Sequence, residues 1–451
     1  MKRILTLETL KNIKKEVALA GWVDRRRDHG RLVFIDLRDR SGVVQVVGGT
    51  ELGELRPEFV VEIVGRVEKR PENLINPKIP TGAVEVKAKR VKVLAEAASL
   101  PFDMGTEELN LELPTLLDYR ALTLRYPKVQ AIFKVQEAII AGFRMALKEL
   151  GFTEFQAPAI VPVATEGGAE VFPVKYFDHT AYLAQSPQLY KQILVGVFER
   201  VFTLAHAYRA EPSVTARHLT EYLSLDAEMG FIESWEEVVD TAEAVIKKTL
   251  AAVAQGCSRE LEMYGASVPE TSGKIPRIKI RDAQEIIFKR TGRDVRREPD
   301  LSPEDEREIC RWAGEEYKSE LLFVTHYPVS KRPFYTYPDP KDADYTLSFD
   351  LLGRGMELVT GGQRINDYNQ LLANAKKWGN DPKDFELYLQ AFKYGMPPEG
   401  GFALGVERLT MQILGLENLR EASLFPRDME RIDGRLSELR KRKKTTSTRK
   451  R

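Results

Sequence analysis

The sequence predicts an α+β protein with a small N-terminal β-barrel and a larger domain of antiparallel strands flanked by helices. Two observations carry this prediction. Five short segments rich in alternating and β-branched residues fall within the first hundred positions. Beyond them, amphipathic helical patterns alternate with strand pairs that are joined by polar or glycine-containing loops. The chain has 451 residues, enough for two or three domains of ordinary size.

The composition restricts the class of protein. Hydrophobic residues make up 43% of the chain and charged residues 30%, but the net charge is only +1, so nucleic-acid contacts must come from local basic patches. Cys257 and Cys310 lie far apart, which favours buried thiols over a disulfide or zinc site. The sequence contains no apolar run of membrane-spanning length and no signal-peptide pattern at its start. We therefore expect a cytoplasmic protein without a membrane segment.

The barrel prediction comes from five strand segments separated by turn residues. They lie at 17–23, 32–37, 43–47, 59–67 and 83–89. Five short strands in about a hundred residues fit an OB-type barrel, which binds nucleic acid on one face.

One face of this barrel carries residues suited to unpaired bases. Arginines at 25–27 precede a turn, Phe34 follows on the next strand, and Gln45 and Glu85 lie on later strands. Aromatic rings stack on bases, polar side chains read base edges, and arginines hold phosphates. A barrel with Phe34 in its core and the arginines in a solvated turn would have the same residues. The residues alone fit this alternative and the base-binding face equally well.

A helix–strand unit opens the second part of the chain. Apolar residues at helical spacing from Ile132 to Leu150 predict a helix that ends at Gly151. A strand over 152–158 follows and ends in a proline. A long helix leading into such a strand suits a dimer interface, although a core helix would have the same pattern.

The centre of the chain is a predicted hairpin, with strands over 201–209 and 221–231. The second strand alternates apolar and acidic residues, as a half-buried antiparallel strand does. Charge is dense here, and its desolvation is costly unless a ligand pairs it. A salt-bridged surface hairpin would explain any one of these residues, but it explains the whole set poorly. The set is Arg209, Glu211, Arg217, His218, Glu221, Asp226 and Glu228.

Two stretches before the hairpin carry further polar candidates. The loop at 165–170 is rich in glycine but lacks the phosphate-loop spacing, and its Glu170 suits a substrate ammonium group. A helix begins after Ser186 and Pro187 and carries Lys191. Composition alone favours a solvent-facing Lys191.

Two stretches after the hairpin suit a nucleotide. Glu357 and Thr360 lie on a predicted strand, and a carboxylate with a second oxygen donor beside phosphates is a common Mg²⁺ site. Arg364, after two glycines, suits a carboxylate. A glycine-rich strand at 400–405 leads into a helix that starts with Arg408, where phosphates gather. We expect its glycines to let a flat ring approach the backbone.

Taken together, these stretches resemble a class II aminoacyl-tRNA synthetase. The helix–strand unit resembles motif 1, residues 208–219 resemble motif 2, and residues 405–408 resemble motif 3. The motif order and the preceding barrel are similar to the aspartate, asparagine and lysine subgroup. Within it, residues 185–192 and 361–364 resemble the aspartyl-tRNA synthetases.

The resemblance implies an aspartate–tRNA ligase that converts ATP to AMP and pyrophosphate, with Mg²⁺, L-aspartate and tRNA(Asp) as partners, in a homodimer. An asparaginyl enzyme is the alternative, but Lys191 and Arg364 suit an anionic side chain better than an amide. A non-enzymatic tRNA-binding paralogue would lack Arg209, Glu357 or Arg408, and all three are present. The implied domains are an OB-fold anticodon-binding domain at 1–100, a hinge at 101–130, a class II catalytic domain at 131–432 and a basic, disordered tail at 433–451.

The resemblance also implies the site residues, position by position. Arg209, Arg408 and Glu357 are the implied catalytic residues, and Glu357 and Thr360 are the implied metal ligands. The implied ATP-binding residues are Arg209, Ala210, Glu211, Arg217, His218, Leu219, Glu357, Gly405, Val406, Glu407 and Arg408. The implied aspartate-binding residues are Glu170, Gln188, Leu189, Tyr190, Lys191, Arg209, Asp226, Thr360 and Arg364. The implied anticodon-binding residues are Arg27, His29, Phe34, Gln45 and Glu85.

Two features extend this hypothesis to a second tRNA and to the tail. In bacterial-type relatives, a histidine at the position of His29 goes with enzymes that charge both tRNA(Asp) and tRNA(Asn), which predicts a non-discriminating enzyme. The basic segment from residue 440 to the end is predicted to add sequence-independent tRNA affinity, although a merely solubilising end has the same composition.

Overall fold

The computed structural model describes residues 1–106, 108–163, 171–211, 215–271 and 273–436. They form two compact units, Met1–Leu111 and Glu112–Arg451, and each is described by itself. The division falls inside the stretch that the sequence predicts as a hinge.

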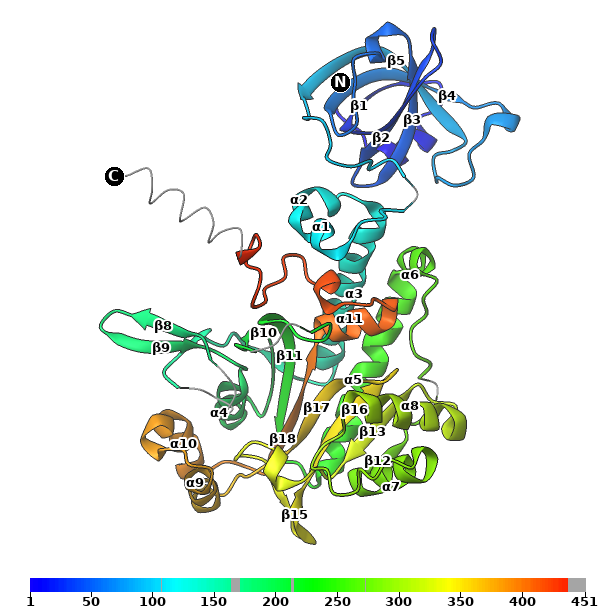
Figure 1. Cartoon of the computed structure of the whole chain (residues 1–451). Helices are drawn as coiled ribbons and strands as arrows, with labels where there is room; N and C mark the ends of the chain where they lie inside the picture. The colour runs from blue at the N-terminus through cyan, green and yellow to red at the C-terminus, as the bar shows by residue number, and fades with distance from the viewer. Residues whose placement is uncertain (107, 164–170, 212–214, 272, 437–451) are drawn as a thin grey trace, which may run out of the picture. The chain divides into compact units, whose positions relative to one another are not determined.

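The first unit is a closed barrel of five strands in the order β1-β2-β3-β5-β4 (Figure 1). Its strands are β1 (Glu16–Asp28), β2 (Val33–Asp39), β3 (Gly42–Gly48), β4 (Val60–Lys69) and β5 (Val84–Ala95). Short 3₁₀ turns lie at η1 (Thr6–Lys11), η2 (Thr50–Leu52) and η3 (Glu72–Leu74). Along β2, Val33, Ile35 and Leu37 are buried while Phe34 and Asp36 are only partly covered, so one face fills the barrel. The predicted OB-type barrel is confirmed.

The second unit is built on an eight-stranded sheet in the order β12-β13-β16-β17-β18-β11-β10-β6. The two outermost pairs, β12 with β13 and β10 with β6, are parallel, and the pairs between them are antiparallel. The last strand of the chain, β18, lies between β17 and β11. The strands are β6 (Thr153–Glu154), β10 (Arg200–Tyr208), β11 (Glu221–Gly230), β12 (Arg277–Lys279), β13 (Leu321–Thr325), β16 (Ser348–Gly353), β17 (Met356–Arg364) and β18 (Glu399–Gly405).

Two smaller sheets and the helices complete this unit. The small sheets join β7 (Ile160–Val161), β9 (His179–Leu183) and β8 (Pro173–Tyr176), and β14 (Pro338–Asp339) with β15 (Asp342–Thr346). The α-helices are α1 (Leu113–Asp118), α2 (Arg120–Thr123), α3 (Pro127–Glu149), α4 (Gln188–Phe198), α5 (Trp235–Gly256), α6 (Ser258–Tyr264), α7 (Ile280–Thr291), α8 (Pro303–Tyr317), α9 (Tyr368–Lys377), α10 (Glu386–Lys393) and α11 (Val406–Leu414). The 3₁₀ turns are η4 (Val329–Lys331), η5 (Pro382–Phe385) and η6 (Leu419–Ala422).

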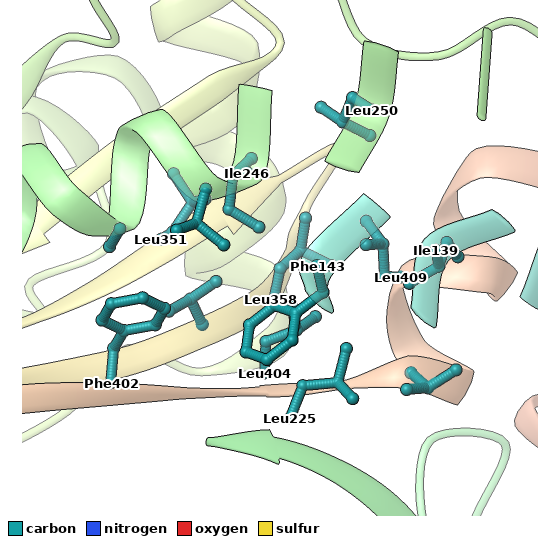
Figure 2. Close-up of a cluster of buried hydrophobic side chains, with 14 of the residues drawn as sticks. Ile139, Phe143, Leu225, Ile246, Leu250, Leu351, Leu358, Phe402, Leu404 and Leu409 are labelled. Carbon is teal, nitrogen blue, oxygen red and sulfur yellow. The ribbon is translucent and has the colours of Figure 1, made fainter. Parts of the chain in front are cut away.

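Helices α3, α5 and α11 cover one face of the large sheet (Figure 1). Figure 2 shows their apolar side chains, among them Phe143 and Ile246, packed against Leu225, Leu358 and Leu404 from the strands. These side chains are almost completely buried, and each stabilises the fold by about 1.5–3 kcal/mol relative to exposure. The other face of the sheet is therefore left for polar residues.

Two sequence-based expectations about the sheet were wrong in detail. Strand β6 covers two residues rather than 152–158, because only Thr153 and Glu154 pair with β10, opposite Val201 and Phe202. Strand β11 alternates as predicted but is not half-buried, since Asp226 and Glu228 on its polar face are 1% and 0% exposed. The charges on that face are neutralised inside the protein, as described below.

Capping residues and a glycine define several element ends. Ser302 caps α8 by accepting from the Asp305 N–H at 3.3 Å, and Gly151 adopts φ +81° just after α3. Cys257 and Cys310 are buried free thiols. Within the described parts of the chain, the structure contains no helix with the length and apolar character needed to span a bilayer.

Candidate active site

A cavity of about 450 Å³ opens on the polar face of the large sheet. Strands β11, β17 and β18, helix α4 and the start of α11 contribute side chains to its wall. It brings together most of the residues that the resemblance implied for ATP and aspartate. These are Gln188, Lys191, Arg209, Glu211, Arg217, His218, Leu219, Asp226, Glu357, Thr360, Arg364, Gly405, Glu407 and Arg408.

The other implied residues do not line the cavity or lie outside the described residues. Leu189 is buried in an apolar cluster that Tyr190 packs against, and Val406 belongs to the core under α11. Ala210 lies beside Arg209 in the chain, but its side chain is not part of the wall among the described residues. Glu170 lies outside the described residues, so its predicted contact with a substrate ammonium group stays a prediction.

One end of the cavity carries two buried cations. The Nζ atom of Lys191 lies 3.0 Å from Asp226 Oδ1 and 3.1 Å from Glu228 Oε2. Arg364 Nε donates to Glu228 Oε1 at 2.8 Å. Burial disfavours the charge of Arg364, but the adjacent Glu228 more than offsets this and raises the arginine pKa. A buried pair of cations held by carboxylates is suited to a substrate carboxylate.

Lys191 corrects the expectation from composition, which favoured solvent. The residue is 0% exposed because α4 packs over β10 and β11 and turns this side chain inward. Its ammonium group also donates to the Phe402 carbonyl at 3.3 Å. The resemblance, rather than the composition, placed this residue correctly in the cavity.

The glycines of β18 do a different job from the one expected. A Cβ at Gly401 would lie 2.0 Å from Glu228 Oε2, and one at Gly400 would lie 2.8 Å from the Gly362 carbonyl oxygen. These two glycines therefore make room for the protein's own carboxylate and neighbouring strand, not for a flat ring. Gly405 is open, since the nearest atom to its Cβ position is the Arg408 side chain at 3.9 Å.

The opposite end of the cavity gathers residues suited to phosphates. Arg209 lies over the Tyr222 ring at 5.7 Å, and Arg408 Nη1 lies 3.3 Å from Glu357 Oε1. His218 Nδ1 and Thr215 Oγ1 lie 2.6 Å apart. Burial, with smaller contributions from nearby arginines, lowers the pKa of His218, so its ring is neutral near pH 7.

Arg217 pairs with a residue that the sequence did not connect to it. Its Nη1 donates to Glu306 Oε2 at 3.0 Å and its Nη2 to the Gly355 carbonyl at 3.3 Å. Glu306 lies in the first turn of α8, where an acidic residue favours the helix start. Burial and the nearby Glu357 raise the Glu306 pKa to about 7. The two residues are 89 positions apart in the sequence, and no local pattern predicts their contact.

Glu357 and Thr360 line the same cavity only because β17 is irregular. Residues three apart on a regular strand face opposite sides. Here the register shifts so that Leu351 faces Val359 while Leu352 faces Glu357, which makes Leu358 the extra residue of a β-bulge. The bulge turns the carboxylate of Glu357 and the hydroxyl of Thr360 toward one space.

Arg332 is a further cavity residue that sequence reasoning missed. Its Nη1 donates to Thr360 Oγ1 at 3.0 Å and its Nη2 to Asp350 Oδ2 at 2.8 Å. The guanidinium also lies 4.0 Å from the Tyr327 ring centroid. The only sequence signal is a pair of basic residues after β13, which does not distinguish it from many surface arginines.

The oxygen atoms around Glu357 fit a cation that arrives with phosphates. Asp350 Oδ1 is buried and has no hydrogen-bond partner among the described residues. Burial and Asp350 raise the pKa of Glu357. The described residues contain no cluster of three or more His, Cys, Asp or Glu side chains placed to hold a metal. Mg²⁺ needs only one or two carboxylates when phosphates and water supply the remaining oxygens.

In the N-terminal unit, the implied anticodon residues lie on neighbouring strands. Arg27 pairs across with Phe34, and its guanidinium donates to both oxygens of Asp36 at 3.0 and 2.8 Å. Gln45 Nε2 donates to Glu85 Oε2 at 3.2 Å. The ring of His29 meets Phe34 edge-on at 5.5 Å. Phe34 is partly exposed on the outer face, so the alternative of a core phenylalanine was wrong. Asp36 was not singled out from the sequence.

Comparison with known proteins agrees with this arrangement. Residues 112–429 match the family model of class II tRNA synthetases (D, K and N), and residues 17–94 match that of the OB-fold nucleic acid binding domain. The chain is 47% identical to the aspartate–tRNA(Asp/Asn) ligase of Thermus thermophilus, over 95% of this chain and 99% of that protein. It is 41% identical to the aspartate–tRNA(Asp) ligase of Picrophilus torridus, over 92% and 97%.

Among solved structures, an asparaginyl-tRNA synthetase from Pyrococcus horikoshii complexed with asparaginyl-adenylate superposes with a TM-score of 0.87. It is 33% identical and covers 96% of this chain and 99% of its own. The chain belongs to the class II tRNA synthetases of the D, K and N group. It is an aminoacyl-tRNA ligase that uses ATP as a substrate and carries an N-terminal tRNA-binding barrel.

Proposed function

We propose that this synthetase joins L-aspartate to the 3′ end of tRNA(Asp) through an aspartyl-adenylate. The observation that carries the choice of amino acid is the pair of buried cations, Lys191 and Arg364, at one end of the cavity. Relatives at 40–47% identity that are named aspartate–tRNA ligases support the same choice. The cavity of about 450 Å³ is within the usual size range of small-molecule sites.

The first chemical step is an in-line attack of the aspartate α-carboxylate on the α-phosphate of ATP, which releases pyrophosphate. The chain contributes position and charge. Arg209 lines the same cavity as Lys191 and Arg408, so it holds the α-phosphate beside the attacking carboxylate. Arg408 and Arg217 hold the distal phosphates, and Glu211 reads the adenine amine. In the second step, a terminal ribose hydroxyl of the tRNA takes the aspartyl group and AMP leaves.

Glu357 and Thr360 would hold Mg²⁺, with the buried Asp350 Oδ1 close by as a further oxygen. The bound ion would neutralise charge on the phosphates. The Arg408 side chain, 3.3 Å from Glu357, would then be shared between that carboxylate and a phosphate.

Asparagine is the competing substrate, because a solved structural neighbour is an asparaginyl enzyme. Lys191 and Arg364 are charged donors, and a substrate carboxylate accepts hydrogen bonds from them more strongly than the neutral amide of asparagine does; discrimination follows from that difference. Amino-acid-dependent exchange of pyrophosphate into ATP tests the choice. We expect exchange with aspartate and at least about tenfold less with asparagine, which corresponds to about 1.4 kcal/mol. Faster exchange with asparagine would overturn the proposal.

A finer proposal is that the enzyme also charges tRNA(Asn). His29 packs against Phe34 on the face that is proposed to hold the anticodon, and the aspartate–tRNA(Asp/Asn) ligase of Thermus thermophilus supports this assignment. The test is aminoacylation of separately transcribed tRNA(Asp) and tRNA(Asn) by the wild type and His29→Leu. We expect the wild type to charge both and the variant to lose tRNA(Asn) selectively. A wild type that charges only tRNA(Asp) would contradict this.

Three further assignments stay predictions: a homodimer that uses α3, a cytoplasmic location, and a basic tail that binds tRNA. Sedimentation of the full chain at several concentrations tests the dimer. A salt titration of tRNA binding by the chain with and without residues 437–451 tests the tail, since phosphate contacts weaken with salt.

A further inference from the structure

A fully buried carboxyl group, Glu399, lies outside the cavity wall, near Lys191 and Arg364, and takes no part in the proposed chemistry. It is the first residue of β18 and is 0% exposed. Its Oε1 accepts from Gln192 Nε2 at 2.8 Å. Its Oε2 is buried without a hydrogen-bond partner among the described residues. An ionised carboxylate in such a place is costly, whereas a neutral carboxyl group is much less so.

Glu399 is linked to the cavity through two glutamines. Gln192 accepts at its Oε1 from Gln188 Nε2 at 3.0 Å and from the Tyr388 hydroxyl at 3.2 Å. Because Glu399 accepts from its Nε2, the amide of Gln192 is fixed in one orientation. In that orientation, Gln188 Nε2 donates to Gln192, and the side-chain oxygen Oε1 of Gln188 can face the cavity, which Gln188 lines. A carbonyl oxygen is the group that a substrate ammonium needs.

The charges around Glu399 show why its protonation matters. Two cations, Lys191 and Arg364, face two carboxylates, Asp226 and Glu228, in direct ion pairs. A third negative charge would leave this cluster negative before the substrate carboxylate enters. The groups that face Glu399 are Glu228 on β11, Arg364 on β17, Lys191 and Gln192 on α4, and Tyr388 on α10.

We propose that Glu399 is a positioning residue for the amino-acid substrate. As a neutral carboxyl group, it fixes Gln192 and thereby Gln188 without adding a third negative charge to the aspartate end of the cavity. Burial and then the neighbouring Glu228 raise the pKa of Glu399 well above its usual value, which supports a proton held near pH 7. The inference rests on the proposed function of the site and assigns a role to a residue outside its wall.

Two substitutions separate shape from charge. Glu399→Gln keeps the acceptor oxygen and is neutral at every pH, whereas Glu399→Ala removes the acceptor and frees Gln192 to rotate. In aspartate-dependent pyrophosphate exchange near pH 7, we expect Glu399→Gln to keep the KM for aspartate within about twofold. We expect Glu399→Ala to raise it about tenfold, the effect of one lost buried hydrogen bond, with the KM for ATP unchanged in both.

The pH profile tests the proton. The KM for aspartate of the wild type, divided by that of Glu399→Gln, should stay level up to neutral pH and rise about tenfold at alkaline pH as Glu399 ionises. Titration of the substrate ammonium affects both enzymes and cancels in this ratio. A ratio that stays constant with pH, or a Glu399→Ala variant with the wild-type KM, would overturn the proposal.

A second readout does not depend on the substrate. A carboxyl group whose folded pKa is raised loses stabilising free energy as pH rises from about 4.5, because the unfolded state ionises first. The thermal midpoint of the wild type should therefore fall relative to that of Glu399→Gln as pH rises. If the thermal midpoint shifts in this way but aspartate-dependent exchange is absent, the proposed function is wrong, whereas the neutral state of Glu399 is supported. If exchange is present without the shift, the inference fails alone.

Discussion

The hydroxyl of Thr360 accepts a hydrogen bond from Arg332 at 3.0 Å and faces the cavity beside Glu357. It is a small group, but it fixes one buried arginine directly and, in the proposed function, is a ligand of Mg²⁺. It fixes the Arg332 guanidinium, which in turn holds Asp350 at 2.8 Å, and it offers an oxygen to a cation. A serine would supply the same oxygen, while valine has the same shape without it.

The first prediction follows from that comparison. Thr360→Ser should keep the kcat/KM for ATP in pyrophosphate exchange within about threefold, whereas Thr360→Val should lower it by about 10- to 100-fold, since an unsatisfied buried donor costs about 1–3 kcal/mol. A Mg²⁺ titration of the exchange rate should also move to higher concentration in Thr360→Val alone. Equal behaviour of the two variants would remove the hydroxyl from the site.

The sequence predicts site residues that belong to a local motif. It does not predict residues whose partners lie far away in the chain. Arg209 and Arg408 sit in recognisable motifs and line the cavity. Arg332 and Glu306 acquire their roles only through partners on other strands and helices. Glu228 was singled out from the sequence, but its ion pairs with Lys191 and Arg364 were not predicted. One sequence without its fold contains no distance between such residues.

At the scale of an element, β18 shows how a strand divides its two faces. Phe402 and Leu404 pack into the core under the helices, and Ala403 lines the cavity. Gly401 stands opposite Glu228, whose carboxylate occupies the space that a side chain would fill. The strand is therefore as closely fitted on its polar face as on its apolar one.

A second prediction compares two glycines of this strand. Gly401→Ala places a Cβ 2.0 Å from Glu228 Oε2 and 2.2 Å from the Ala227 carbonyl oxygen, both fixed by their strand. We expect it to lower the free energy of unfolding by about 1–3 kcal/mol or more and to impair aspartate binding. Gly405→Ala is the matched control. It meets only open space, so its thermal midpoint should match the wild type. Equal midpoints for both variants would refute the steric argument.

A third prediction concerns the contact between α11 and β11. The carboxylate of Glu407 accepts the Leu223 N–H at 3.1 Å, and burial raises its pKa to about 7. The unfolded carboxyl ionises near its usual value of about 4.5, so folding stability falls as pH rises from there to about 7, by on the order of 2–3 kcal/mol. Glu407→Gln keeps the acceptor without the titration.

Thermal unfolding from about pH 5 to about pH 8 measures this effect. The wild type should lose stability relative to Glu407→Gln across that window, and the difference should level off above it. A constant difference between the two proteins would mean that the carboxyl of Glu407 titrates normally in the folded state.

Regular elements were the most predictable level. All five barrel strands, the α3 helix and the central hairpin of β10 and β11 follow from periodicity and turn residues. The bulge at Leu358 did not, because it depends on pairing with β16 and on packing rather than on a local pattern. The same holds for the burial of β11, whose acidic face reads as solvent-exposed until Lys191 and Arg364 are placed beside it.

At the scale of the whole molecule, the two units have separate cores, one inside the barrel and others around the large sheet. Within the catalytic unit, distant segments are tied together near the cavity. Arg120 donates to the carbonyls of Ser423 and Leu424 at 2.6 and 2.9 Å. The same C-terminal stretch, through the Leu419 N–H, donates to the Ala216 carbonyl in the loop beside Arg217.

A fourth prediction uses this division. Residues 112–451 expressed alone should retain aspartate-dependent pyrophosphate exchange with KM values within about threefold, because every described cavity residue belongs to this unit. Aminoacylation should fall by about a hundredfold or more, since each lost base contact costs about 1–3 kcal/mol. Residues 1–111 alone should show one cooperative unfolding transition. Full aminoacylation by the catalytic unit would contradict the role given to the barrel.

The position of β18 has a consequence for folding during synthesis. This strand follows the other seven strands of its sheet in the chain and leaves the ribosome after them, yet it lies between the strand that carries Asp226 and the strand that carries Glu357 and Arg364. The barrel precedes the large sheet in the chain, so it can fold during synthesis before that sheet is complete. A nascent or truncated chain that stops before residue 399 therefore has the barrel face but no assembled active site. We expect such a chain to bind tRNA before it can aminoacylate it.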